Sequence, residues 1–240
     1  MSTQRQSPLL LAVETTGACG SVALVDGQGC RGEYSLHSRR THSRRLLSAI
    51  EGLLAACEID WPQLDGIAVA LGPGSFTGLR IGLSSVKGLA LATGKPLLGI
   101  GSLDALAAQV PFTPYPVCPL IDARKGEVFS AFFSFSPTAE HRAAPVGRRT
   151  SDYLALPPAE LAVRITTPTL LLGSGAELYR EQLREQLAEL AIFAPPTLFF
   201  PRAAAVGQLA LDKWQRRDFL APATAAPLYI RPSDAKLPTP

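Results

Sequence analysis

Two carboxylates follow buried apolar runs, where they could hold a metal ion. Glu14 ends the first such run, and Asp122 ends another in the second half. Strand-end carboxylates can bind Mg²⁺ for phosphoryl transfer, but they can also cap their own turns by accepting backbone N–H groups. Both turns lack the glycine pair expected beside nucleotide phosphates, because Thr15-Thr16 and Arg124-Lys125 stand there. Capping is favoured, and weak nucleotide contact through Glu14, Thr15, Thr16, Asp122 and Lys125 stays open.

A glycine-rich run, Gly72-Pro73-Gly74-Ser75-Phe76-Thr77-Gly78, follows an apolar strand and opens a helix. Backbone N–H groups at a helix N-terminus can bind an anion. However, no Gly-Lys-Ser/Thr follows, and Thr77 stands where a dinucleotide motif has its third glycine. A tight strand-to-helix turn is therefore favoured over a phosphate site.

The helix after this turn contains three glycines, Gly78, Gly82 and Gly88. Each costs roughly 0.5–1 kcal/mol relative to alanine in a helix interior. Gly78 and Gly82 lie one turn apart, so they could let another helix approach closely. Packing within the chain and contact with a partner protein are about equally supported by this pattern.

Composition and charge exclude several classes of protein. The chain has 240 residues, with 47% apolar and 18% charged residues, which is typical of a globular protein. The net charge is only +3. One basic cluster, Arg39, Arg40, Arg44 and Arg45, fits a solvated helix start at least as well as a phosphate-binding face.

Cysteine and histidine usage does not indicate a metal site. The four cysteines, Cys19, Cys30, Cys57 and Cys118, have neither metal-site nor redox-motif spacing, and only three histidines are present. His42 stands among arginines and has no apolar surroundings typical of a catalytic base. Reduced core cysteines fit a cytoplasmic protein. No apolar run approaches the roughly 20 residues of a membrane span.

The hydrophobic pattern predicts an α/β fold with an internal duplication. Prolines at 111, 114 and 116 mark the boundary between the copies. The first copy has expected strands at 9–13, 21–25, 31–36, 67–71 and 97–100 and helices at 41–57, 76–92 and 103–110. The second has strands at 117–121, 128–135, 146–149 and 170–172 and helices at 158–163 and 174–190. We therefore predict an N-terminal lobe at 1–110, which is joined by a helix at 202–217, a C-terminal lobe at 111–200 and an extended tail at 218–240.

Four segments closely resemble the TsaB (YeaZ) family. The run Gly72–Gly82 is similar to its signature, and Ala12–Thr16 resembles its opening strand, with Glu14 in place of the usual aspartate. Residues Ile121–Phe129 resemble its central hairpin, and Leu228–Arg231 its C-terminal segment. Together these segments span nearly the whole chain in the family's order.

This resemblance implies a duplicated actin-like fold of the sugar kinase/Hsp70 type. It also implies a subunit with no catalytic residues or intrinsic cofactor, which pairs with the catalytic TsaD subunit and the ATPase TsaE. The assembly transfers threonylcarbamoyl to the tRNA adenosine beside the anticodon, with ATP or ADP at the interface as an open alternative. We expect partner contact, and a homodimer of the isolated chain, through the first two long helices: Leu46, Ile50, Leu53, Gly74, Ser75, Phe76, Thr77, Gly78, Leu79, Arg80, Gly82, Leu83 and Val86.

One departure separates this chain from the catalytic paralogue. That paralogue binds a metal through a His-x-x-x-His pair after the strand corresponding to 97–100, whereas this chain has Ser102-Leu103-Asp104-Ala105-Leu106 there. We therefore expect no metal and no peptidase activity. The alternative function is a free-standing ATPase or small-molecule kinase of the same fold.

Overall fold

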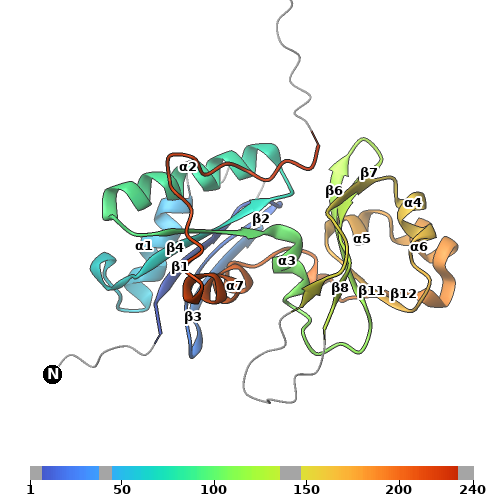
Figure 1. Cartoon of the computed structure of the whole chain (residues 1–240), viewed down its shortest axis with the longest axis horizontal. Coiled ribbons are helices and arrows are strands. Elements are labelled where there is room, and N and C mark those ends of the chain that lie inside the picture. Colours follow the sequence, from blue (N-terminus) through green and yellow to red (C-terminus); the bar gives the residue numbers. More distant parts are fainter. Residues whose placement is uncertain (1–6, 38–44, 136–146, 232–240) are drawn as a thin grey trace, which may run out of the picture.

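The computed structural model describes residues 7–37, 45–135 and 147–231, which form two lobes (Figure 1). His42, most of the basic cluster and the last nine residues of the expected tail lie outside the described residues. No helix in the described ranges combines the length and the apolar character needed to span a membrane.

The N-terminal lobe is built on a five-stranded sheet in the order β3-β2-β1-β4-β5. Its strands are β1 (Leu10–Glu14), β2 (Cys19–Asp26), β3 (Gly29–His37), β4 (Gly66–Gly72) and β5 (Leu97–Gly101). β1, β4 and β5 run parallel, whereas β2 is antiparallel to both of its neighbours. Every residue of β1 is buried, because helices cover both faces of the sheet.

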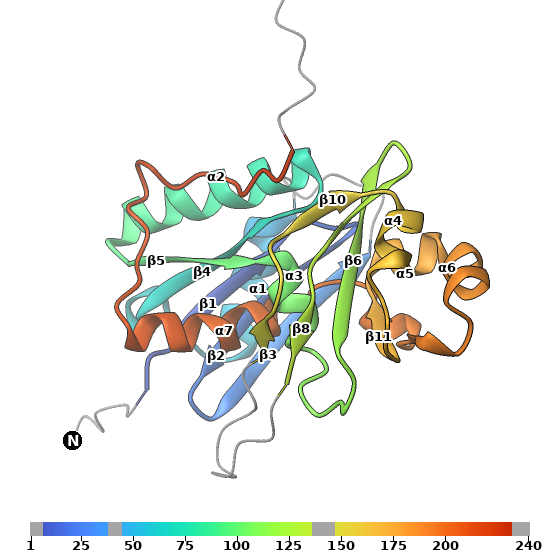
Figure 2. The ribbon, with the colours of Figure 1, turned by 45° about the vertical axis from the view of Figure 1, so that its right-hand side comes forward.

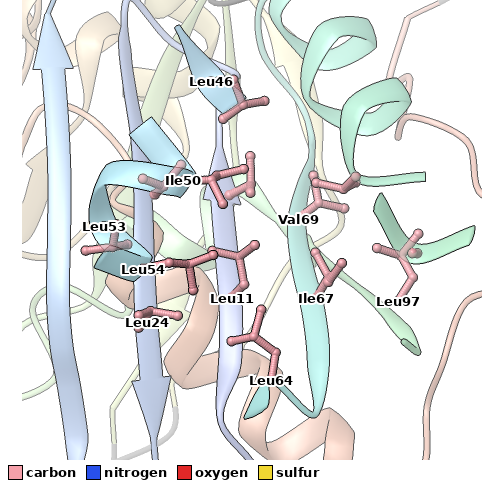
Figure 3. Close-up of a cluster of buried hydrophobic side chains, with 14 of the residues drawn as sticks. Leu11, Leu24, Leu46, Ile50, Leu53, Leu54, Leu64, Ile67, Val69 and Leu97 are labelled. Carbon is pink, nitrogen blue, oxygen red and sulfur yellow. The ribbon is translucent and has the colours of Figure 1, made fainter. Parts of the chain in front are cut away.

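Two helices cover one face of this sheet, α1 (Leu46–Ala56) and α2 (Phe76–Thr93). Ile50 and Leu53 of α1 pack against Leu11, Leu24 and neighbouring strand residues (Figure 3). The other face is covered by α7 (Ala203–Gln215) and α3 (Ser102–Ala107). A short 3-10 helix, η2 (Trp61–Gln63), precedes β4.

The C-terminal lobe repeats this arrangement around the order β10-β7-β6-β11-β12, with β8 pairing β6 and β9. Its strands are β6 (Val117–Arg124), β7 (Glu127–Ser130), β8 (Phe133–Ser134), β9 (Arg148–Arg149), β10 (Leu154–Leu156), β11 (Thr169–Leu172) and β12 (Ala191–Phe193). Its helices are α4 (Pro158–Val163), α5 (Ser174–Leu178), α6 (Arg180–Leu187), η3 (Ala188–Leu190) and η4 (Pro196–Leu198). In both lobes the third, second, first, fourth and fifth main strands lie side by side, which confirms the predicted duplicated α/β fold.

Several expected elements of the second lobe were wrong in detail. The strand expected at 128–135 is split into β7 and β8, which pair with different parts of β6. The third place in the sheet belongs to the three-residue β10, while only Arg148 and Arg149 of the segment 146–149 form a strand. The helix expected at 174–190 breaks at Tyr179, and β12 was not predicted. Strands this short show no usable hydrophobic period.

Candidate functional site

The C-terminal ends of the parallel strands β1, β4 and β5 lie at one edge of the N-terminal sheet. Glu14, Gly72 and Gly101 are the last residues of these strands. Open α/β sheets bind ligands at the C-terminal ends of their parallel strands, so these strand ends form the candidate site.

Glu14 is fully buried at this edge and caps its own turn. Its Oε1 accepts hydrogen bonds from the backbone N–H of Thr16, at 2.6 Å, and from the Thr16 hydroxyl. Its Oε2 has no hydrogen-bond partner among the described residues. Burial raises the pKa of Glu14 to about 7, although the bonds from Thr16 oppose the shift. The carboxyl group therefore titrates near neutral pH.

The glycine-rich turn packs directly on the turn after Glu14. The Ser75 N–H donates to the carbonyl of Thr16 at 2.7 Å, and the Leu79 N–H donates to the Ser75 carbonyl at 2.8 Å. The Gly78 N–H donates to the Ser75 hydroxyl at 3.3 Å. Because these donors bond within the chain, the geometry supports a tight strand-to-helix turn more than an anion site.

Gly78 and Gly82 allow α2 to lie against Thr15. The Thr15 hydroxyl donates to the Gly78 carbonyl at 2.8 Å. A Cβ on Gly78 would lie 2.0 Å from the Thr15 carbonyl oxygen, and one on Gly82 would lie 2.2 Å from Thr15 Oγ1. The expectation that these glycines open α2 to a partner is therefore wrong, since the close approach occurs within the lobe.

The apolar residues expected at a partner contact are also part of this lobe's own interior. All six are buried, namely Leu46, Ile50, Leu53, Leu79, Leu83 and Val86. Of the other candidates, Ser75, Phe76, Thr77 and Arg80 are exposed and Gly74 is half-buried. The Arg80 guanidinium lies over the Phe76 ring, 3.7 Å from its centroid.

Sequence reasoning missed four other residues that α1 and α2 expose, namely Leu47, Ser84, Gly88 and Leu91. Gly88 is exposed, and a Cβ built on it would meet nothing within 4 Å. Leu91 is 71% exposed and Leu47 of α1 is 49% exposed. A helical projection could have separated Gly88 from Gly82, because six residues at 100° each place them on different sides of the helix. We call Leu47, Thr77, Arg80, Ser84, Gly88 and Leu91 the outer α1–α2 face.

Asp122 is held in the other lobe by its own hairpin. Its Oδ1 accepts from the Arg124 N–H at 2.8 Å, and its Oδ2 lies 3.2 Å from Arg124 Nη1. The Asp122 N–H donates to the Ser174 hydroxyl at 3.3 Å. Lys125 is exposed at the hairpin tip. The bonds of Glu14 and Asp122 thus match the capping role favoured by the sequence.

The segment that replaces the paralogue's histidine pair forms a contact between the lobes. Asp104 of α3 accepts a hydrogen bond from the hydroxyl of Tyr153, which precedes β10. Burial, followed by the charge of Asp104, raises the pKa of Tyr153 above its usual range. Across the described ranges, no group of three or more His, Cys, Asp or Glu side chains is arranged to hold a metal ion.

The fold and this edge define a duplicated, two-lobed α/β protein, whose strand-end carboxylates cap their own turns. The family model described as "TsaD: tRNA N6-adenosine threonylcarbamoyltransferase" matches residues 35–238. The chain belongs to this family, and its resemblance to the TsaB (YeaZ) proteins is confirmed.

Individual relatives agree with this assignment. The Bacillus subtilis tRNA threonylcarbamoyladenosine biosynthesis protein TsaB is 27% identical over 205 residues, covering 85% of this chain and 87% of the relative. An uncharacterised protein of Mycobacterium bovis is 30% identical over 233 residues, covering 96% and 95%. A Pseudomonas aeruginosa crystal structure, described as similar to peptidase YEAZ, is 28% identical with a TM-score of 0.79 and covers 93% of this chain and all of that one.

Proposed function

We propose that this chain is a non-catalytic subunit of the machinery that places threonylcarbamoyl on the tRNA adenosine beside the anticodon. It docks a TsaD-type catalytic subunit, and a TsaE-type ATPase joins the pair. Family membership and the name of the Bacillus subtilis relative support the pathway. A scaffolding role is supported by the bonds of Glu14, Asp122 and the α2 N-terminus, which are made within the chain.

The observation that carries the docking part of this proposal is the outer α1–α2 face. Leu91 and Leu47 expose apolar side chains, while Gly88 bares the backbone of α2 to the outside. Helices pack with axes 8–10 Å apart, and a glycine at the contact permits the closer end of this range. A helical surface on the catalytic subunit would fit this face. Any ATP or ADP in the assembly is expected at the composite interface.

A Leu91→Glu substitution should weaken binding of the TsaD-type subunit about 10- to 100-fold, because it places a charge in the apolar part of the contact. Titration calorimetry measures this affinity, and reconstituted tRNA modification should slow and then recover when the subunit is in excess. Val163→Glu is the matched control, since Val163 is 81% exposed on α4 of the other lobe. Equal affinities for both variants would place the docking surface elsewhere.

The same face is proposed to join two copies of the isolated chain as a two-fold dimer, because Leu47 and Leu91 expose apolar surface that self-association would cover. Sedimentation of the native protein should then show a dimer that Leu91→Glu dissociates and Val163→Glu does not. A strict monomer at high concentration would contradict homodimer formation, while leaving the affinity measurement for the catalytic subunit as an independent test.

The isolated chain is expected to hydrolyse ATP negligibly, since its strand-end carboxylates are engaged by their own turns. Phosphate release from the purified protein, measured with and without Mg²⁺, tests this expectation. Turnover that is abolished by Glu14→Ala or Asp122→Ala would instead favour a free-standing ATPase or small-molecule kinase.

A further inference from the structure

The described segment that follows α7 returns along α2 and reaches the C-terminal lobe at residue 231 (Figures 1 and 2). It is anchored to the N-terminal sheet at two points by backbone bonds. The Leu220 N–H donates to the Leu97 carbonyl of β5 at 2.8 Å, and the Leu228 N–H donates to the Leu71 carbonyl of β4 at 2.7 Å. The segment between these two points is therefore fixed to the lobe, although it forms neither helix nor long strand.

Side chains of α2 also contact this segment. The Lys87 ammonium donates to the carbonyls of Ala223, at 3.4 Å, and Ala225, at 3.1 Å. The rings of Phe76 and Tyr229 lie 5.6 Å apart between centroids. Contacts thus continue as far as the N-terminal end of α2, and this end of the helix lies toward the other lobe (Figure 2).

Beyond Tyr229 the segment crosses to the C-terminal lobe through Arg231. One guanidinium nitrogen lies 2.6 Å from Glu127 Oε2 at the start of β7, and another donates to the Ala123 carbonyl of β6 at 3.3 Å. The Arg231 and Glu127 side chains are 29% and 30% exposed. Because this pair is partly shielded from water and charge-assisted, it is stronger than a fully exposed ion pair.

Arg231 therefore contacts both strands of the β6–β7 hairpin. The tip of that hairpin, Arg124 to Gly126, has positive φ angles of 64°, 54° and 79°. The Arg124 N–H is further bonded to Asp122 Oδ1. The hairpin therefore has a fixed conformation. Because its strands β6 and β7 belong to the C-terminal sheet, Arg231 is bonded to the sheet of that lobe and not only to a loop.

We infer that residues 220–231 form an interlobe latch, in which the Arg231–Glu127 pair fixes the angle between the two lobes. Its N-terminal anchors lie on β4, β5 and α2, and its C-terminal anchor is the β6–β7 hairpin. The Asp104–Tyr153 contact lies at α3, away from this latch (Figure 2). Breaking Arg231–Glu127 leaves the α3 contact as a hinge, and the lobes open on the side of the latch.

Hydrogen exchange of the full-length chain tests the latch without any partner protein, so its outcome is independent of the proposed function. Arg231→Ala should accelerate exchange about 5- to 30-fold at the Leu228 amide and in the β6–β7 hairpin, the factor expected for loss of one partly buried ion pair. The radius of gyration from X-ray scattering should rise. The exchanged pair Glu127→Arg with Arg231→Glu should restore both measurements toward the native values.

Glu181→Ala is the matched control, because it breaks an ion pair of 2.9 Å with Arg184 that lies wholly within α6. This variant should change neither hairpin exchange nor scattering. Faster exchange confined to residues 224–231 in Arg231→Ala would show that the segment packs on one lobe without restraining the other. Unchanged exchange at all of these sites would equally overturn the latch.

Discussion

Gly78→Ala should lower the free energy of unfolding by about 2–4 kcal/mol, through overpacking and loss of a buried hydrogen bond. The added Cβ would lie 2.0 Å from the Thr15 carbonyl oxygen, so α2 and the β1–β2 turn must separate. That separation also weakens the bond from the Thr15 hydroxyl to the Gly78 carbonyl. The melting temperature should fall by about 5–15 °C for a chain of this size.

Gly88→Ala provides the control on the same helix. Its Cβ meets nothing within 4 Å, so the variant should gain about 0.5–1 kcal/mol from helix propensity alone. Urea denaturation of the native protein and of both variants measures how much each substitution changes the free energy of unfolding. Equal stability of Gly78→Ala and Gly88→Ala would mean that α2 does not depend on its close approach to Thr15.

Glu14 should make the protein less stable as the pH rises from about 4.5 to about 7. Burial raises the pKa of Glu14 from 4.5 to about 7. Between these values the folded state retains a proton that the unfolded state has lost, so stability is present at low pH and decreases through this window. The loss should be about 3 kcal/mol, from roughly 1.4 kcal/mol for each unit of pKa difference.

Glu14→Gln isolates this contribution. The amide oxygen can still accept from Thr16, but the side chain cannot ionise, so the dependence on pH due to residue 14 should disappear. The free energy of unfolding of Glu14→Gln should also be lower by a constant amount at every pH, because its amide nitrogen takes the place of the unpartnered Oε2 and is buried without an acceptor. Urea unfolding at pH 5, 6, 7 and 8 gives both curves, with Glu181→Gln as an exposed control. Parallel curves for native protein and Glu14→Gln would contradict the raised pKa.

The sequence alone was sufficient to predict the duplicated α/β fold and most elements of the first lobe. Those elements have either a fully apolar strand or a clear helical period, and Gly94 in the left-handed conformation ends α2 where expected. The capping bonds of Glu14 and Asp122 also follow from local chemistry, because each carboxylate reaches an N–H two residues ahead. Such interactions depend little on the remainder of the chain.

The outer face of α2 required the structure, because it depends on what packs against the other faces. Gly78 and Gly82 are compatible with either an inner or an outer contact until Thr15 is placed beside them. The latch was equally inaccessible, since Arg231 and Glu127 are separated by about a hundred residues with no motif connecting them. Short strands such as β10 and β12 arise from pairing with neighbours rather than from their own pattern.

The position of α7 has a consequence for how the chain is synthesised. α7 supplies Ala203, Val206 and Ala210 to the face of the N-terminal sheet that also contains Leu10 and Leu98. A ribosome completes all five strands of that sheet, and then the whole second lobe, before it releases this helix. The apolar face therefore stays only partly covered, by α3, during translation, and a nascent chain that stops before α7 carries a sheet prone to aggregation.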